Sequence, residues 1–105
     1  MKIYEINHHH IKFNNGNCIT YSCPDESYAY ADFQYLDLES LDDIEFKNHL
    51  KFEVVDKYGF RFGSNPQQMV FVPCYASDSG YYSSDIEIYY CKKKVLKFNT
   101  KYDKE

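Results

Sequence analysis

Alternation of apolar and polar residues is the strongest pattern in this 105-residue sequence. A period of two residues places successive side chains on opposite faces of a strand, so it predicts β-structure with one buried face. Residues 11–13 and 18–21 are short β-forming segments on either side of Asn14-Asn15-Gly16-Asn17. An Asn-Gly pair between two such segments is a strong hairpin signal, because both residues tolerate positive φ angles.

Two further hairpins are predicted in the second half of the chain. Residues 51–55 and 60–62 flank Asp56-Lys57-Tyr58-Gly59, a sequence typical of a tight turn. Residues 86–91 and 95–98 flank three consecutive lysines. Short strands at this close spacing indicate antiparallel pairing.

Two segments are expected to form longer strands. Residues 28–36 alternate, and the expected shared face consists of Ala29, Ala31, Phe33 and Tyr35. Residues 68–75 also have the composition of a strand. Because Pro73 has no N–H to donate, this second strand should lie at the edge of a sheet or end near the proline.

Residues 40–54 are ambiguous between helix and strand. Ser40 with Asp43 three positions later resembles a capping box, and Leu41 and Ile44 would share a helix face. Against this, the even positions from 44 to 54 are apolar except for position 48, and the odd positions from 45 to 53 are polar. We expect a short helical turn near residues 40–44 followed by a strand. A longer helix that reaches residue 49 is the alternative.

The fold class that follows is mainly β, in one domain over residues 1–105. We expect about six to eight short strands in a compact antiparallel sheet, sandwich or small barrel, with at most one short helix near residues 40–49. A β-rich α+β arrangement is the alternative. The tail at residues 99–105 is expected to fray.

We expect the protein to act in the cytoplasm of a bacterial host cell. No run approaches the roughly 18 apolar residues that a membrane helix needs. Residues 1–6 alternate like a strand and do not resemble a signal peptide. In a reducing compartment the cysteines should be free thiols. They are Cys18, Cys23, Cys74 and Cys91.

Charge is distributed very unevenly along the chain. The segment from Phe13 to Phe46 has eight carboxylates and no lysine or arginine, whereas the whole chain has a net charge of −4. The remainder therefore carries a net charge of +4. The eight carboxylates are Asp25, Glu26, Asp32, Asp37, Glu39, Asp42, Asp43 and Glu45. A field of one sign on a small protein selects basic partners, although a solvated acidic face would give the same pattern.

Tyrosines lie among these carboxylates and in a second segment. Carboxylates can replace phosphates on a protein that imitates nucleic acid, and tyrosine rings supply flat contact area. Residues 75–85 combine Tyr, Ser and Gly, the chemistry of adaptable recognition loops, although an ordinary polar loop has the same composition. The predicted partner-binding residues are Asp25, Glu26, Tyr28, Tyr30, Asp32, Tyr35, Asp37, Glu39, Asp42, Asp43, Tyr81 and Tyr82.

Signals for other chemistry are weak. The cysteine spacing is too loose for a structural zinc site, and only His8 and His10 of the three consecutive histidines would converge in a strand. No nucleophile motif or phosphate-binding loop is present in the sequence. We therefore expect no metal, no cofactor and no enzymatic activity. The lysines near the C-terminus are expected to be a solvated hairpin tip rather than a nucleic-acid patch.

These features lead to a functional hypothesis. We expect a small acidic, non-enzymatic inhibitor that binds a nucleic-acid-handling protein and occludes its basic groove. Its concrete form would be a phage or mobile-element anti-defence protein of the anti-CRISPR type. The alternatives are an immunity protein that neutralises a toxin nuclease, or a structural or assembly protein of a virus. Neither direct nucleic-acid binding nor membrane binding is expected.

Overall fold

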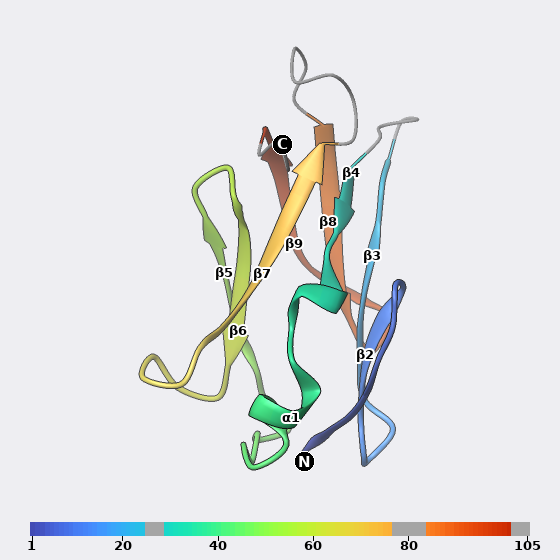
Figure 1. The fold of residues 1–105 in the computed structure, drawn as a ribbon. Helices are drawn as coiled ribbons and strands as arrows, with labels where there is room; N and C mark the ends of the chain where they lie inside the picture. Colours follow the sequence, from blue (N-terminus) through green and yellow to red (C-terminus); the bar gives the residue numbers. More distant parts are fainter. Residues whose placement is uncertain (25–28, 77–83, 102–105) are drawn as a thin grey trace.

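The computed structural model describes residues 1–24, 29–76 and 84–101, and its strands form two antiparallel sheets (Figure 1). The five-stranded sheet has the order β1-β2-β3-β8-β9, and the four-stranded sheet has the order β4-β7-β6-β5. The mainly β, antiparallel prediction is therefore confirmed. The described residues form nine strands, one more than the upper number expected.

The elements have the following bounds. The first sheet contains β1 (Ile3–Ile6), β2 (His10–Phe13), β3 (Cys18–Ser22), β8 (Ser84–Tyr90) and β9 (Lys93–Thr100). The second sheet contains β4 (Ala29–Ala31), β5 (Lys51–Val55), β6 (Gly59–Gly63) and β7 (Val70–Ala76). The connection from β4 to β5 includes a 3-10 turn (Phe33–Tyr35) and the helix α1 (Leu38–Leu41). Among the described residues, no helix has the length and apolar character needed to cross a membrane.

The three predicted hairpins are all present, as β2–β3, β5–β6 and β8–β9. In the first turn only Gly16 of the Asn-Gly pair has a positive φ, at 94°. In the last hairpin the turn lies at Cys91 and Lys92, which have φ angles of 53° and 69°. The turn therefore begins one residue before the three lysines at which it was predicted. Two successive residues with positive φ form the tight two-residue turn that suits a hairpin.

The core is built from phenylalanines of both sheets and of the connection between β4 and β5. The ring of Phe13 is 5.6 Å from that of Phe46 between centroids, and the ring of Phe46 is 5.7 Å from that of Phe62. Phe46 lies outside any regular element, yet only 2% of it is exposed. Its side chain therefore anchors the long β4–β5 connection to the core.

The prediction of one strand over residues 28–36 is wrong beyond Ala31. Phe33 is buried as expected, but the 3-10 turn changes the side-chain period, and 63% of Tyr35 is exposed. The prediction for Pro73 is also wrong, because β7 lies between β4 and β6 and continues to Ala76.

The end of β4 explains how Pro73 fits inside a sheet. The carbonyl of Pro73 accepts a 2.8 Å hydrogen bond from the N–H of Asp32. Since the N–H and C=O of a strand residue point to the same neighbour, the missing proline donor would face the carbonyl of Asp32. That carbonyl instead accepts from the N–H of Tyr35 at 3.1 Å, as the chain enters the 3-10 turn. The local end of β4 therefore compensates for the proline.

The connection after the 3-10 turn also differs from expectation. The helix begins after Asp37, whose carboxylate accepts hydrogen bonds from the N–H of Glu39 (3.1 Å) and the hydroxyl of Ser40 (2.9 Å). Asp37 is thus the N-cap, and Ser40 is not. The helix does not extend to residue 49, and the next strand begins only at Lys51.

At the other end of the chain, β9 continues two residues into the segment expected to fray. Thr100 is fully buried, and its hydroxyl lies 2.8 Å from the carbonyl oxygen of Lys57 and 2.9 Å from that of Cys74. These carbonyls belong to the β5–β6 turn and to β7, so one hydroxyl links the two sheets. Residues 102–105 lie outside the described residues.

Replacing Thr100 with valine should therefore destabilise the protein. The valine keeps the shape but removes the hydroxyl, whose single proton lies within reach of both carbonyls, so at least one of them loses its donor. This loss should lower the free energy of unfolding by about 1–3 kcal/mol. The matched control is Thr20→Val at a half-buried position on β3, where a change within about 0.5 kcal/mol is expected. Urea denaturation of both variants tests the link, and equal stabilities would contradict it.

Candidate functional site

The carboxylates of the β4–β5 connection form the main candidate site, here called the acidic segment (residues 32–45). Five of its six carboxylates belong to exposed residues. They are Asp37, Glu39, Asp42, Asp43 and Glu45. Asp32 is half-buried at the end of β4. The helix in this segment lies at the end of the molecule where the N-terminus is found (Figure 1).

Only part of this negative charge is neutralised within the molecule. Glu45 accepts a 2.5 Å hydrogen bond from the α-ammonium group of Met1, which lowers the pKa of the Glu45 carboxyl. The same ammonium group donates to the carbonyl of Phe46 at 2.6 Å. In the part of the chain that the structure describes, no lysine or arginine forms an ion pair with the remaining exposed carboxylates of the segment. These are Asp37, Glu39, Asp42 and Asp43.

Two predicted tyrosines fall in the described residues, and they have different environments. Tyr35 is largely exposed beside the carboxylates, whereas Tyr30 is half-buried with its ring 5.5 Å from that of Tyr75. Leu38 is 37% exposed and lies between Asp37 and Glu39. Sequence reasoning missed Leu38, because an apolar residue next to a predicted helix start is normally assigned to the core.

The structure thus brings together some of the predicted residues. Those that share the acidic segment are Tyr35, Asp37, Glu39, Asp42 and Asp43, with Asp32 at its start. Five predicted residues lie outside the described residues: Asp25, Glu26, Tyr28, Tyr81 and Tyr82.

The lysines of the β8–β9 hairpin are partly neutralised by an acidic neighbour. Lys94 forms a 2.7 Å ion pair with Glu87, and the hydroxyl of Tyr89 donates to the same carboxylate at 3.0 Å. The hydrogen bond from Lys94 lowers the pKa of Glu87, and the carboxylate raises the pKa of Lys94 and of Tyr89. Glu87 is only 8% exposed, and Lys94 and Tyr89 both supply hydrogen-bonding partners for its carboxylate.

Glu87 should accordingly make stability depend on pH at both extremes. Because the folded-state pKa of Glu87 lies below its ordinary value of 4.5, its contribution is present above that value. It is lost as the pH falls through the folded-state pKa. Because the pKa of Lys94 is raised above 10.5, the contribution of Lys94 is lost as the pH rises through that raised value.

Glu87→Gln removes both effects. The urea midpoint of this variant should fall less than that of the wild type between neutral pH and about pH 3. It should also fall less than that of the wild type above about pH 10.5. The control Glu39→Gln removes an exposed carboxylate that lies outside this pair, so the variant should keep the pH dependence that Glu87 and Lys94 cause. Parallel profiles for the wild type and Glu87→Gln would show that the pair does not contribute to stability.

The thiols and histidines have the following environments in the described part of the chain. The four cysteines are free thiols, and burial raises the pKa of Cys74. His10 contacts Glu5 at 2.5 Å through Nε2, and this hydrogen bond lowers the pKa of Glu5. Within residues 1–24, 29–76 and 84–101, no group of three or more His, Cys, Asp or Glu side chains is placed to hold a metal ion.

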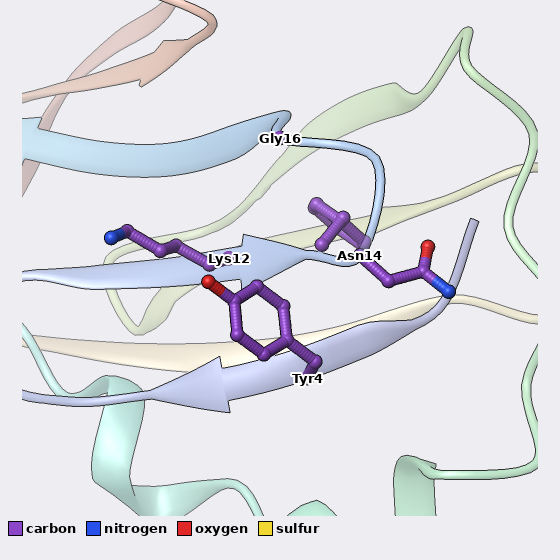
Figure 2. Close-up of a pocket in the computed structure, with 5 residues that line it drawn as sticks. Tyr4, Lys12, Asn14 and Gly16 are labelled. Atoms are coloured by element: carbon purple, nitrogen blue, oxygen red, sulfur yellow. The ribbon is translucent and has the colours of Figure 1, made fainter.

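The surface also has open hollows. One, of about 470 Å³, lies against β1, β2 and the turn that follows β2. Figure 2 shows the ring of Tyr4 in this hollow, with the side chains of Lys12 and Asn14 extending in opposite directions. Across the strands, Lys12 pairs in register with Glu5, so an acidic group already lies near its charge. A second hollow, of about 440 Å³, lies at the junction of the two sheets.

Comparisons with known proteins add no family or relative, since no protein-family model, curated protein or solved structure matches this chain. The candidate site is therefore defined by the charge and exposure of the acidic segment itself.

Proposed function

We propose that this protein is a small acidic, non-enzymatic inhibitor that binds a nucleic-acid-handling protein through the acidic segment and blocks its basic groove. The observation that supports the proposal is the group formed by Asp37, Glu39, Asp42 and Asp43. These four exposed carboxylates lie within residues 37–43 and have no lysine or arginine partner among the described residues.

Electrostatics makes a basic groove the best fit for such a segment. Mutual repulsion among unpaired carboxylates opposes the compact state, and a cationic partner relieves it on binding. The same field accelerates the encounter with a positively charged surface and repels nucleic acid itself. A groove that holds phosphates therefore matches the sign of these charges.

Apolar contact next to the charges gives a second argument. Tyr35 and Leu38 are exposed within the acidic segment. Charged groups contribute mainly to orientation and rate, whereas buried aromatic and aliphatic groups supply much of the affinity in protein interfaces. We assign Tyr35 as the anchor, with the carboxylates around it pairing with Lys or Arg of the partner.

The biological form that we propose is an anti-defence protein of a phage or mobile element, of the anti-CRISPR type, acting in the bacterial cytoplasm. An immunity protein against a toxin nuclease would use the same electrostatics. The identity of the captured partner distinguishes these two. A viral assembly protein would instead bind copies of itself, which light scattering after size exclusion detects.

Capture from a bacterial lysate that contains defence nucleases tests the proposal. The immobilised protein should retain a nucleic-acid-binding protein at low salt, release much of it at high salt, and lose it when DNA or RNA is added. Retention that is insensitive to both salt and nucleic acid, or retention of the protein's own copies alone, would contradict competitive binding.

A further inference from the structure

The junction between the two sheets contains a pocket that the proposed function does not use. The strands β5 and β9 each end a sheet and lie close together. In the described residues they share no ladder pairing, since β5 pairs with β6 and β9 pairs with β8. The hollow of about 440 Å³ opens at this junction, and we call it the seam pocket. Its size is within the usual range of small-molecule sites.

Two aromatic rings form part of the wall of the seam pocket, and their positions are fixed. The rings of Phe52 and Tyr90 lie 5.6 Å apart between centroids. The hydroxyl of Tyr90 donates to the carbonyl of Asn48 at 2.7 Å and accepts from the amide of Asn17 at 3.0 Å. Leu50 and Val95 add aliphatic lining. A flat apolar group could therefore bind here without reorganising the site.

The lining includes basic side chains, in a protein whose net charge is −4. Lys93 and His49 are exposed side chains of the lining, and the described residues of the lining include no aspartate or glutamate. Among the described residues Lys93 forms no ion pair, whereas its neighbour Lys94 is bound to Glu87. In the hollow at Tyr4, by contrast, the lysine of the lining is Lys12, and Glu5 lies opposite it on the neighbouring strand.

We propose that the seam pocket binds a small organic anion with a flat apolar body, such as an aromatic carboxylate. The ring of the ligand packs against the Phe52 and Tyr90 side of the pocket, and its carboxylate pairs with Lys93. This site is independent of the acidic segment, so either assignment can fail without the other.

Naphthoate is a suitable probe, and its uncharged amide, naphthamide, is the matched control ligand. Naphthoate should give saturable chemical-shift changes at the backbone amides of the pocket, and naphthamide should bind about fivefold or more weakly, the loss expected for one exposed ion pair of about 1 kcal/mol. Lys93→Gln should weaken naphthoate to the level of naphthamide. Lys97→Gln, which changes a β9 lysine outside the pocket, should leave binding unchanged.

Cys91 provides a second measurement. It is the exposed cysteine of the described residues and lines the pocket, whereas the other three are half-buried or buried. Saturating naphthoate should slow its alkylation by iodoacetamide. The proposal is overturned if naphthoate gives no saturable shifts, if the shifts map to the hollow at Tyr4, if Lys93→Gln binds as well as the wild type, or if alkylation is unaffected.

Discussion

Replacing Gly59 with alanine is expected to lower the free energy of unfolding by about 4 kcal/mol or more, a large share of the stability of a protein this size. An added Cβ would lie 2.1 Å from the carbonyl oxygen of Val72 and 3.0 Å from backbone atoms of Pro73 and Cys74. These are backbone atoms of a central strand, so they cannot move aside as a flexible side chain would. The φ angle of Gly59, 154°, adds strain for any residue with a side chain.

Gly16→Ala is the matched control for this prediction. Gly16 also has a positive φ, at 94°, but an added Cβ would have no atom of the described residues within 4 Å. The substitution should therefore cost only the backbone strain, about 1–2 kcal/mol. Urea denaturation monitored by circular dichroism compares the two variants. Similar losses at both positions would show that the close approach of β6 to β7 at Gly59 is not as described.

Reversing three charges of the acidic segment should weaken binding to the captured partner by about 100-fold or more. The variant is Glu39→Lys, Asp42→Lys and Asp43→Lys, three exposed residues. Asp37 is left intact because its carboxylate caps α1. Replacing it could destabilise the helix, and a loss of affinity could then not be attributed to the charge alone. Each reversal replaces an attraction by a repulsion, so the effects should accumulate and the dependence of affinity on salt should become shallower.

A neutral version of the same triple substitution is the control. Glu39→Gln with Asp42→Asn and Asp43→Asn should give an intermediate loss of affinity, because it removes the attraction without adding repulsion. Circular dichroism spectra and urea midpoints of both variants should remain close to those of the wild type, since exposed substitutions usually change stability by less than about 0.5 kcal/mol each. An unchanged affinity in the reversed variant would exclude these three carboxylates from the interface.

The parts of the fold that were predictable from the sequence depend on local chemistry. The hairpins follow from turn residues such as Gly16 and Asp56, whose backbone angles are set within four residues. The failure at Pro73 is non-local, because its place inside the sheet depends on where β4 ends, about forty residues earlier in the sequence. The capping residue was missed because Asp37 and Ser40 both precede acidic residues, and only the backbone geometry distinguishes them.

The candidate site also has features that depend on local sequence and features that depend on distant residues. Its charge was visible in the sequence, because a run of carboxylates without lysine or arginine needs no structure to be recognised. The pairing of Glu45 with the Met1 ammonium group was not predictable, since it joins residues 44 positions apart. The seam pocket was equally hidden, because Asn17, Phe52 and the β8–β9 hairpin that contains Tyr90 and Lys93 are far apart in the sequence. Its assembly requires the order of both sheets.

The most direct test of the central claim is a paired capture experiment with the wild type and the charge-reversed variant. Both proteins are immobilised at equal density, exposed to the same lysate at low salt, and the retained proteins are identified by mass spectrometry. We expect the wild type to retain a nucleic-acid-binding protein that added DNA or RNA displaces, and we expect the variant not to retain it. The same protein retained equally by both would contradict the claim that the acidic segment is the binding surface.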